Sequence, residues 1–249
     1  MQQTDKGGAR RKLTQWNDGW LLGLCALLAA AVFFIGSGGA AAESAVKIPP
    51  PALDLPASPA ATETAVFAGG CFWGVQAVFQ HTEGVIQAVS GYAGGEAKYA
   101  TYDAVSRGGT GHAESVQVTY DPKKISYGKL LQIYFSVAHD PTQLNRQFPD
   151  VGPHYRSAIF YKDAQQQKVA QQYIAQLDAA KVYREKIVTQ VSSLPGFYRA
   201  EDYHQDYATV HPTQPYIATY DLPKLTHLKR LFPDLYREKP VLVAQGTRK

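Results

Sequence analysis

The feature that most constrains the fold is the change in spacing of apolar residues between positions 64 and 191. Alternating or continuous apolar runs predict β-strands at 64–68, 84–92, 115–120, 158–161 and 187–191. Between these runs, helical spacing predicts helices that begin near Cys71, Tyr127 and Asp163. This order predicts an α+β fold: a two-layer α/β sandwich around a mixed β-sheet, with a ferredoxin-like core and a long irregular C-terminal segment.

The N-terminal segment, residues 1–42, has the pattern of a targeting signal. A basic start precedes an apolar stretch at 20–35, and the small residues Ala40-Ala41-Ala42 come directly before Glu43. This pattern predicts a cleaved signal peptide and therefore an exported, periplasmic or otherwise extracytoplasmic protein. The alternative is that the segment stays uncleaved as a single-pass inner-membrane anchor.

The rest of the chain divides into three parts. Residues 43–62 are rich in Pro and Ala, which predicts an extended, semi-rigid linker that contributes nothing to a core. Residues 63–235 form one folded domain, and 236–249 form a C-terminal tail. Residues 43–249 contain 21 basic and 19 acidic side chains, with no basic stripe that would indicate nucleic-acid binding. We expect a monomer.

Of the two cysteines, Cys25 lies in the apolar N-terminal run, so the domain contains Cys71 alone. Cys71 follows two glycines and opens a helix, a strand–turn–helix arrangement. The first helical turn presents free N–H groups and partial positive charge, which stabilise a thiolate. The sequence therefore predicts a reactive thiol whose pKa lies below the ordinary value of roughly 8.5.

Six motifs in this chain occur in the same order in the A-type peptide methionine sulfoxide reductases. They are Gly70-Cys71-Phe72-Trp73-Gly74, Gly91-Tyr92-Ala93-Gly94-Gly95, Gly111-His112-Ala113-Glu114, His139-Asp140-Pro141, the run 150–157 and the run 200–205. The chain resembles this family from about Val66 to Tyr207. One motif is a weak signal, whereas six in order are a strong one.

The resemblance implies that Cys71 attacks the sulfur of an oxidised methionine and that Glu114 manages the proton. A sulfoxide oxygen leaves poorly unless it is protonated, so reduction needs a nucleophile and a nearby acid. A carboxyl group in an apolar pocket keeps its proton to higher pH, which suits it to this role. Because a deprotonated thiol and a protonated carboxyl are both needed, we expect a bell-shaped pH dependence.

The resemblance also implies roles for five further side chains. Two hydroxyls would hydrogen-bond the sulfoxide oxygen, one carboxylate would orient the site, and two aromatic rings would receive the methionine methyl group. These residues are Tyr102 and Tyr155, then Asp150, then Phe72 and Trp73.

After the reaction Cys71 would be left as a sulfenic acid. Many relatives resolve this state with further cysteines near the C-terminus, but no cysteine follows Cys71 here. An external thiol must therefore reduce the sulfenic acid, either a thioredoxin-like protein or a small thiol. The resemblance implies action on the S epimer of methionine sulfoxide, free or in proteins and peptides, without cofactor or metal.

Two other functions remain possible on the sequence alone. A cysteine hydrolase would pair Cys71 with a histidine as general base, although the known local signatures of that class are absent. A non-enzymatic module would bind peptides through the tyrosine-rich C-terminal region. Replacing Cys71 would abolish activity in both enzymes but spare the binding module.

Overall fold

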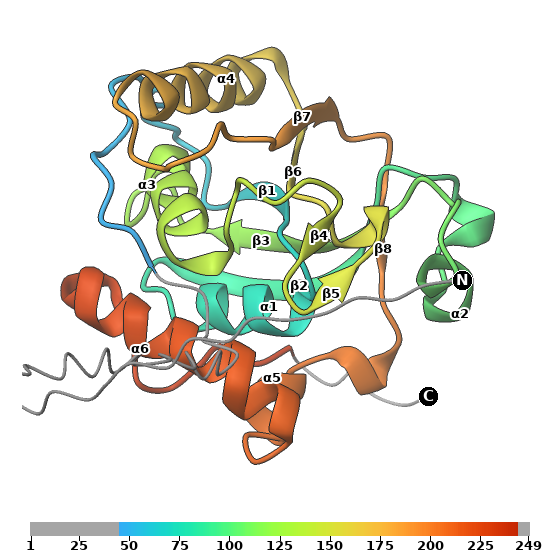
Figure 1. Cartoon of the computed structure of the whole chain (residues 1–249). Helices are drawn as coiled ribbons and strands as arrows, with labels where there is room; N and C mark the ends of the chain where they lie inside the picture. The colour runs from blue at the N-terminus through green and yellow to red at the C-terminus, as the bar shows by residue number, and fades with distance from the viewer. Residues whose placement is uncertain (1–44, 244–249) are drawn as a thin grey trace, which may run out of the picture. The chain divides into compact units, whose positions relative to one another are not determined.

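The computed structural model describes residues 45–243 (Figure 1). The expected signal peptide or anchor at 1–42 lies outside the described residues. Among residues 45–243, no helix is both long enough and apolar enough to span a bilayer.

A six-stranded sheet forms the centre of the domain, with the order β7-β6-β1-β3-β2-β8. Its strands are β1 (Glu63–Ala68), β2 (Val85–Ala93), β3 (Ala113–Tyr120), β6 (Ala158–Tyr161), β7 (Gln190–Ser193) and β8 (Phe197–Arg199). The β6–β7 pair is parallel and the other pairs are antiparallel, so the predicted mixed sheet is confirmed. A separate hairpin consists of β4 (Arg146–Gln147) and β5 (Asp150–Val151).

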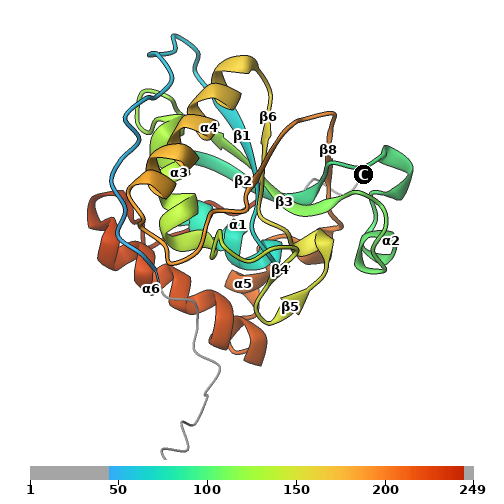
Figure 2. The same cartoon turned by 45° about the horizontal axis from the view of Figure 1, so that its top comes forward.

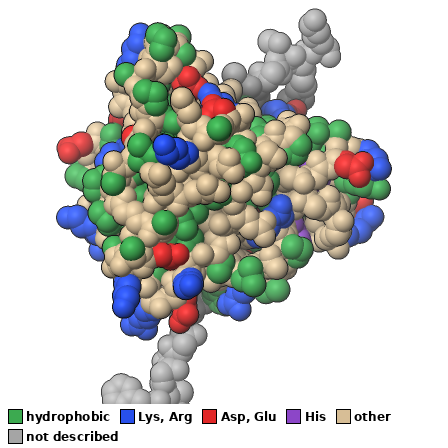
Figure 3. Space-filling view, turned by 90° about the horizontal axis from the view of Figure 1, so that it is seen from above, with side chains coloured by type: hydrophobic (Ala, Val, Ile, Leu, Met, Phe, Trp, Pro, Cys, Tyr) green, Lys and Arg blue, Asp and Glu red, His purple; other side chains and the backbone are tan. Residues whose placement is uncertain are grey.

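The helices are α1 (Phe72–Gln80), α2 (Tyr102–Ser106), α3 (Tyr127–Ile133), α4 (Ala164–Ala179), α5 (Tyr207–Val210) and α6 (Leu222–Leu231). Short 3-10 turns are η1 (Ala97–Tyr99), η3 (Pro153–Tyr155), η4 (Asp202–His204) and η6 (Pro233–Leu235), and π turns are η2 (Tyr134–Ala138) and η5 (Ile217–Asp221). Charges of both signs are interspersed with apolar side chains on the face shown in Figure 3.

The main core lies between one face of the sheet and the helices α1, α3 and α4 (Figure 2). Alternation along β1 sends Phe67 into this core and its neighbour Val66 into a smaller cluster on the opposite face. The Phe67 ring stacks on Phe79 of α1 and Tyr134 of η2, with ring centres 5.2 and 5.0 Å apart. Strand β1 is thus fixed from both sides, and its end has a defined position.

Most predicted elements occur close to their predicted bounds. The helix expected from Tyr127 extends to Ala138, but its last turn is the π turn η2. The last predicted strand, 187–191, is displaced to Gln190–Ser193. Strand β8 and helix α2 were not predicted, because they are too short to show a periodic apolar pattern.

The prediction of a linker without core contacts is wrong for residues 46–55. Ile48 is only 4% exposed and belongs to the main core. The Val46 N–H donates to the Ser136 carbonyl (3.1 Å), and the Tyr173 hydroxyl donates to the Pro49 carbonyl (2.6 Å). Polar groups on α4 and η2 therefore satisfy the backbone of this Pro-rich segment, which composition alone could not reveal.

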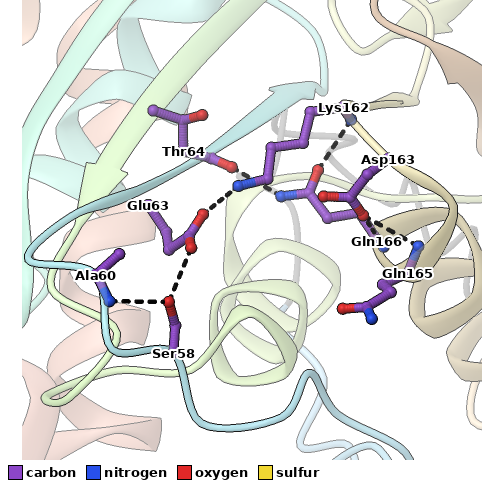
Figure 4. Close-up of polar contacts among 8 residues, drawn as sticks. All are labelled: Ser58, Ala60, Glu63, Thr64, Lys162, Asp163, Gln165 and Gln166. Atoms are coloured by element: carbon purple, nitrogen blue, oxygen red, sulfur yellow. Dashed lines mark hydrogen bonds and ion pairs between the residues drawn. The ribbon is translucent and has the colours of Figure 1, made fainter.

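Further along the same segment, Ser58 and Lys162 both contact the Glu63 carboxylate, and the Ser58 hydroxyl donates to it (3.0 Å; Figure 4). The Asp163 side chain accepts the N–H groups of Gln165 and Gln166 and so caps α4, as its sequence position predicted. The segment before β1 is in this way tied to the start of α4.

The C-terminal tail also packs on the domain over its described part. The Val241 N–H donates to the Gln80 carbonyl at 3.0 Å, and the Val243 N–H donates to the Asp206 carboxylate at 3.1 Å. Val243 is buried. The long irregular C-terminal segment therefore wraps the domain and covers the outer side of α1.

Candidate active site

The turn between β1 and α1 places Cys71 at the N-cap of α1. Gly70 has a φ of +89°, a left-handed conformation that favours glycine. A Cβ at Gly70 would also lie 2.5 Å from Gln147 Cγ of the β4–β5 hairpin. Cys71 is half-buried and makes no disulfide. The predicted strand–turn–helix placement of this thiol is confirmed.

Glu114, the second residue of β3, lies against the start of α1. Its side chain is buried, with the residue 3% exposed, and its Oε2 accepts the Phe72 N–H at 3.0 Å. Burial raises the pKa of Glu114 to about 8, while the hydrogen bond from Phe72 acts in the opposite direction. A carboxyl group that holds its proton near neutral pH therefore lies beside the residue that follows Cys71.

The predicted low pKa of Cys71 is wrong for the free enzyme. Burial raises the pKa of this thiol well above its ordinary value, and the negative charges of Glu114 and Asp221 raise it further. The Trp73 backbone N–H lowers the pKa, as expected at a helix start, but this contribution is smaller. The sequence showed the helix terminus and, through the family resemblance, Glu114 and Asp150, but it did not show the burial of Cys71 or the presence of Asp221.

Tyr102 and Tyr155 face the same pair of groups. Both are half-buried, and burial raises the pKa of each, with added contributions from the charges of Glu114 and Cys71. The Glu201 carboxylate fixes the start of α2, because it accepts the Tyr102 N–H (2.9 Å) and the Tyr92 hydroxyl (2.9 Å). The structure thus brings the two predicted hydroxyls to one place.

Asp150 lies on β5, and its carboxylate accepts a hydrogen bond from the Tyr216 hydroxyl. Burial raises the pKa of Asp150, although Tyr216 and Lys224 lower it in part. Asp150 also contributes to the raised pKa of Cys71 and of Glu114, which places it near both groups. Tyr216 was missed in the sequence, where it was one tyrosine among 16.

Phe72 and Trp73 have different environments. Phe72 is 1% exposed and packs against Tyr92 and His204, with ring centres 5.9 and 5.0 Å apart. Trp73 is partly exposed and stacks on Tyr207 at 3.9 Å, and its Nε1–H donates to His204 Nδ1 at 3.2 Å. Trp73 is therefore partly accessible from solvent, whereas Phe72 lies within the core.

Comparison with known proteins agrees with this geometry. The model of the family described as "Peptide methionine sulfoxide reductase" matches residues 63–234. The chain belongs to this family. A peptide methionine sulfoxide reductase MsrA 2 of Mesorhizobium japonicum is 60% identical over 78% of this chain and 100% of its own length. A protein of the same name from Synechocystis is 50% identical over 75% of this chain and 89% of its own.

Two solved structures show the same fold. The reduced form of Mxr1 from Saccharomyces cerevisiae is 31% identical with a TM-score of 0.60, and it covers 66% of this chain and 94% of its own. Methionine sulfoxide reductase A of Corynebacterium diphtheriae is 34% identical with a TM-score of 0.54, over 69% and 86% of the two chains. This reductase is thus an A-type family member, as the six motifs implied, and an oxidoreductase.

Two histidines of this reductase, His139 and His112, have structural partners at both ring nitrogens. His139 Nδ1 pairs with the Tyr134 carbonyl (3.1 Å), His139 Nε2 pairs with the Ser157 hydroxyl (2.7 Å), and burial lowers its pKa to about 3. His112 accepts the Gly95 N–H at Nδ1. Over residues 45–243, no group of three or more His, Cys, Asp or Glu side chains is arranged to hold a metal ion. These contacts leave neither His139 nor His112 free to serve as the general base that a hydrolase needs.

Proposed function

We propose that this reductase converts the S epimer of methionine sulfoxide to methionine, with Cys71 as nucleophile and Glu114 as the group that moves the proton. The observation that carries the proposal is the position of the Glu114 carboxyl group, buried and hydrogen-bonded to the N–H of the residue after Cys71. A nucleophile and an acid of raised pKa meet there at one end of the sheet.

The reaction requires that Cys71 and Glu114 together carry one proton. Glu114 takes the proton of Cys71, the thiolate attacks the sulfoxide sulfur, and Glu114 returns the proton to the oxygen. In total the sulfoxide sulfur gains two electrons and Cys71 loses two. The S–O bond of the substrate breaks, and Cys71 ends as a sulfenic acid bearing the oxygen and the proton.

The surrounding side chains support this transfer in distinct ways. The raised pKa of Tyr102 and of Tyr155 keeps both hydroxyls protonated. Both would therefore donate hydrogen bonds to the sulfoxide oxygen. Asp150, fixed by Tyr216, would orient the site. The exposed part of the Trp73 ring would contact the methionine methyl group.

Regeneration needs an external thiol, because Cys71 is the only cysteine after the N-terminal segment. One thiol condenses with the sulfenic acid, releasing water and forming a mixed disulfide. A second thiol then releases Cys71 and leaves as the oxidised disulfide. A thioredoxin-like protein supplies both thiols in one molecule, and a small thiol supplies them in two.

The proposal also includes a ferredoxin-like core and export of the protein. The succession β1-α1-β2-β3-α3-β6, with the spatial order β6-β1-β3-β2, supports a ferredoxin-like core. Export to an extracytoplasmic compartment is supported by the sequence of residues 1–42. Fusing these residues to a reporter that is active only outside the cytoplasm tests export, and a reporter confined to the cytoplasm would contradict it.

The function is tested by incubating the protein and a thiol reductant with separated epimers of a methionine sulfoxide peptide. We expect the S peptide to lose one oxygen by mass spectrometry and the R peptide to remain unchanged. The Cys71→Ser variant provides the matched control and should leave both peptides unchanged. Reduction by Cys71→Ser, or no reduction by the wild type, would refute the proposal.

A further inference from the structure

A buried ion pair lies behind the first turn of α1. Lys224 Nζ is 3.5 Å from Asp221 Oδ1, and the two residues are 6% and 1% exposed. They are three residues apart at the start of α6, so they lie on one face of that helix. Burying such a pair costs desolvation free energy, and the pair by itself contributes little to the stability of the fold. Its position therefore points to a role other than stability.

The pair is in direct contact with the helix that carries the nucleophile. Gly74 lies three residues after Cys71, within the first turn of α1. A Cβ at Gly74 would overlap Asp221 Oδ1 and would lie 3.0 Å from Lys224 Nζ. The glycine thus allows α6 to bring a carboxylate and an ammonium group against the turn that Cys71 opens.

The charges near Asp221 come from several elements. Lys224 lies on α6, Cys71 caps α1, Glu114 lies on β3, Asp150 lies on β5 and Tyr216 precedes η5. Four of these five neighbours, all except Lys224, become negative when they lose a proton. Asp221 Oδ2 is buried without a hydrogen-bond partner among the described residues.

We propose that the Asp221–Lys224 pair is a positioning device: it holds a carboxylate against the first turn of α1, where that charge keeps the Cys71 thiol in its unreactive state until a sulfoxide binds. This inference rests on the proposed roles of Cys71 and Glu114. A thiol is oxidised far more slowly than a thiolate. In a chain without a resolving cysteine after position 71, the pair would protect the resting nucleophile from peroxide.

The ionisation of these groups agrees with the geometry. Burial raises the pKa of Asp221 to about 6, and Lys224 opposes this shift, so Asp221 is mainly ionised at neutral pH. Its charge raises the pKa of both Cys71 and Glu114.

The test is the pH dependence of Cys71 alkylation by iodoacetamide, which needs no substrate and no catalysis. In Asp221→Asn the pH of half-maximal rate should fall, and the rate at pH 7.5 should rise by about threefold to tenfold, since one pH unit corresponds to a tenfold change in thiolate. Inactivation by hydrogen peroxide should accelerate by a similar factor. Asp234→Asn, an exposed carboxylate just after α6, is the matched control and should change neither rate.

The double variant Asp221→Asn with Lys224→Gln guards against misfolding, because it leaves no unpaired buried charge. It should shift alkylation in the same direction as the single variant. A fall in alkylation rate, or an unchanged pH profile in both variants, would overturn the inference and leave the pair with a structural role only. Neither result would bear on whether the wild type reduces methionine sulfoxide.

Discussion

The Phe72 N–H donates a hydrogen bond of 3.0 Å to the Glu114 carboxylate, and this contact joins the start of α1 to β3. The residues are 42 positions apart in the sequence. Phe72 follows Cys71 directly, so this contact holds the Glu114 carboxyl group at a fixed position relative to the backbone that carries the nucleophile. It satisfies one of the free N–H groups of the helix start and keeps the acid in place without a flexible side-chain partner.

Replacing Glu114 by Gln should lower kcat/KM for a sulfoxide peptide by about 10²–10⁴-fold, the usual contribution of general acid–base catalysis. Gln keeps the shape and can still accept the Phe72 N–H, so the fold should be retained. Steady-state kinetics measures this loss. At the same time Cys71 alkylation should shift to lower pH, because the negative charge of Glu114 raises the thiol pKa. Full activity of this variant would exclude Glu114 as the acid.

The pH profile of kcat/KM should be bell-shaped with its acid limb near pH 8. Below this pH, both Cys71 and Glu114 hold protons, because the pKa of Glu114 is about 8 and that of Cys71 is higher still. As pH rises, the pair loses the first proton and becomes active, and it becomes inactive again when the second proton leaves. The two limbs belong to the coupled pair and not to either residue. A flat profile from pH 5 to 10, with chemistry rate-limiting, would contradict this assignment.

Replacing Tyr102 and Tyr155 by Phe should lower kcat more than it raises KM. Each hydroxyl would act mainly on the oxygen as its charge develops, so each single variant should lose roughly tenfold and the double variant more. Single-turnover rates with an S-epimer peptide provide the measurement. Tyr161→Phe, near the end of β6, serves as a control that should retain full activity. An increase in KM alone would assign the hydroxyls to ground-state binding.

Replacing Ile48 by Ala should lower the free energy of unfolding by about 2–4 kcal/mol, in the range for buried aliphatic residues. Ile48 belongs to the main core although it lies in a Pro-rich segment. Urea denaturation measures the change, and specific activity at 25 °C should stay near that of the wild type. Lys47→Ala, an exposed neighbour, should leave stability unchanged. Equal stability of both variants would mean that residues 46–55 do not belong to the folded domain.

Much of the fold was predictable because its central elements have long, regular apolar patterns. The strand that leads to Gly69, the helix after Cys71 and the cap at Asp163 each follow from local chemistry. The docking of residues 46–55 was not predictable, because it depends on hydrogen-bond donors such as Tyr173 that are distant in sequence. Short elements such as β8 depend on pairing with β2 and carry no local signal.

Most members of the site and the raised pKa of Glu114 were predictable, whereas Tyr216, Asp221 and the raised pKa of Cys71 were not. The family resemblance located Glu114, Tyr102 and Tyr155, and the structure brings all three toward Cys71. Asp221 was not among the predicted site residues. Its burial against Gly74 arises only when the C-terminal segment wraps around α1. Burial and the charge of Glu114 raise the Cys71 pKa most, and Asp221 adds to them, so a prediction made from the helix start alone had the wrong direction.

The central claim, oxygen transfer to Cys71, is tested most directly by a single turnover without any thiol. The reduced enzyme is mixed with excess S-epimer peptide, quenched with a sulfenic-acid trap and analysed by intact and peptide mass spectrometry. The account predicts one methionine formed per enzyme molecule and the trap attached at Cys71. Formation of methionine without modification of Cys71, or modification at another residue, would contradict it.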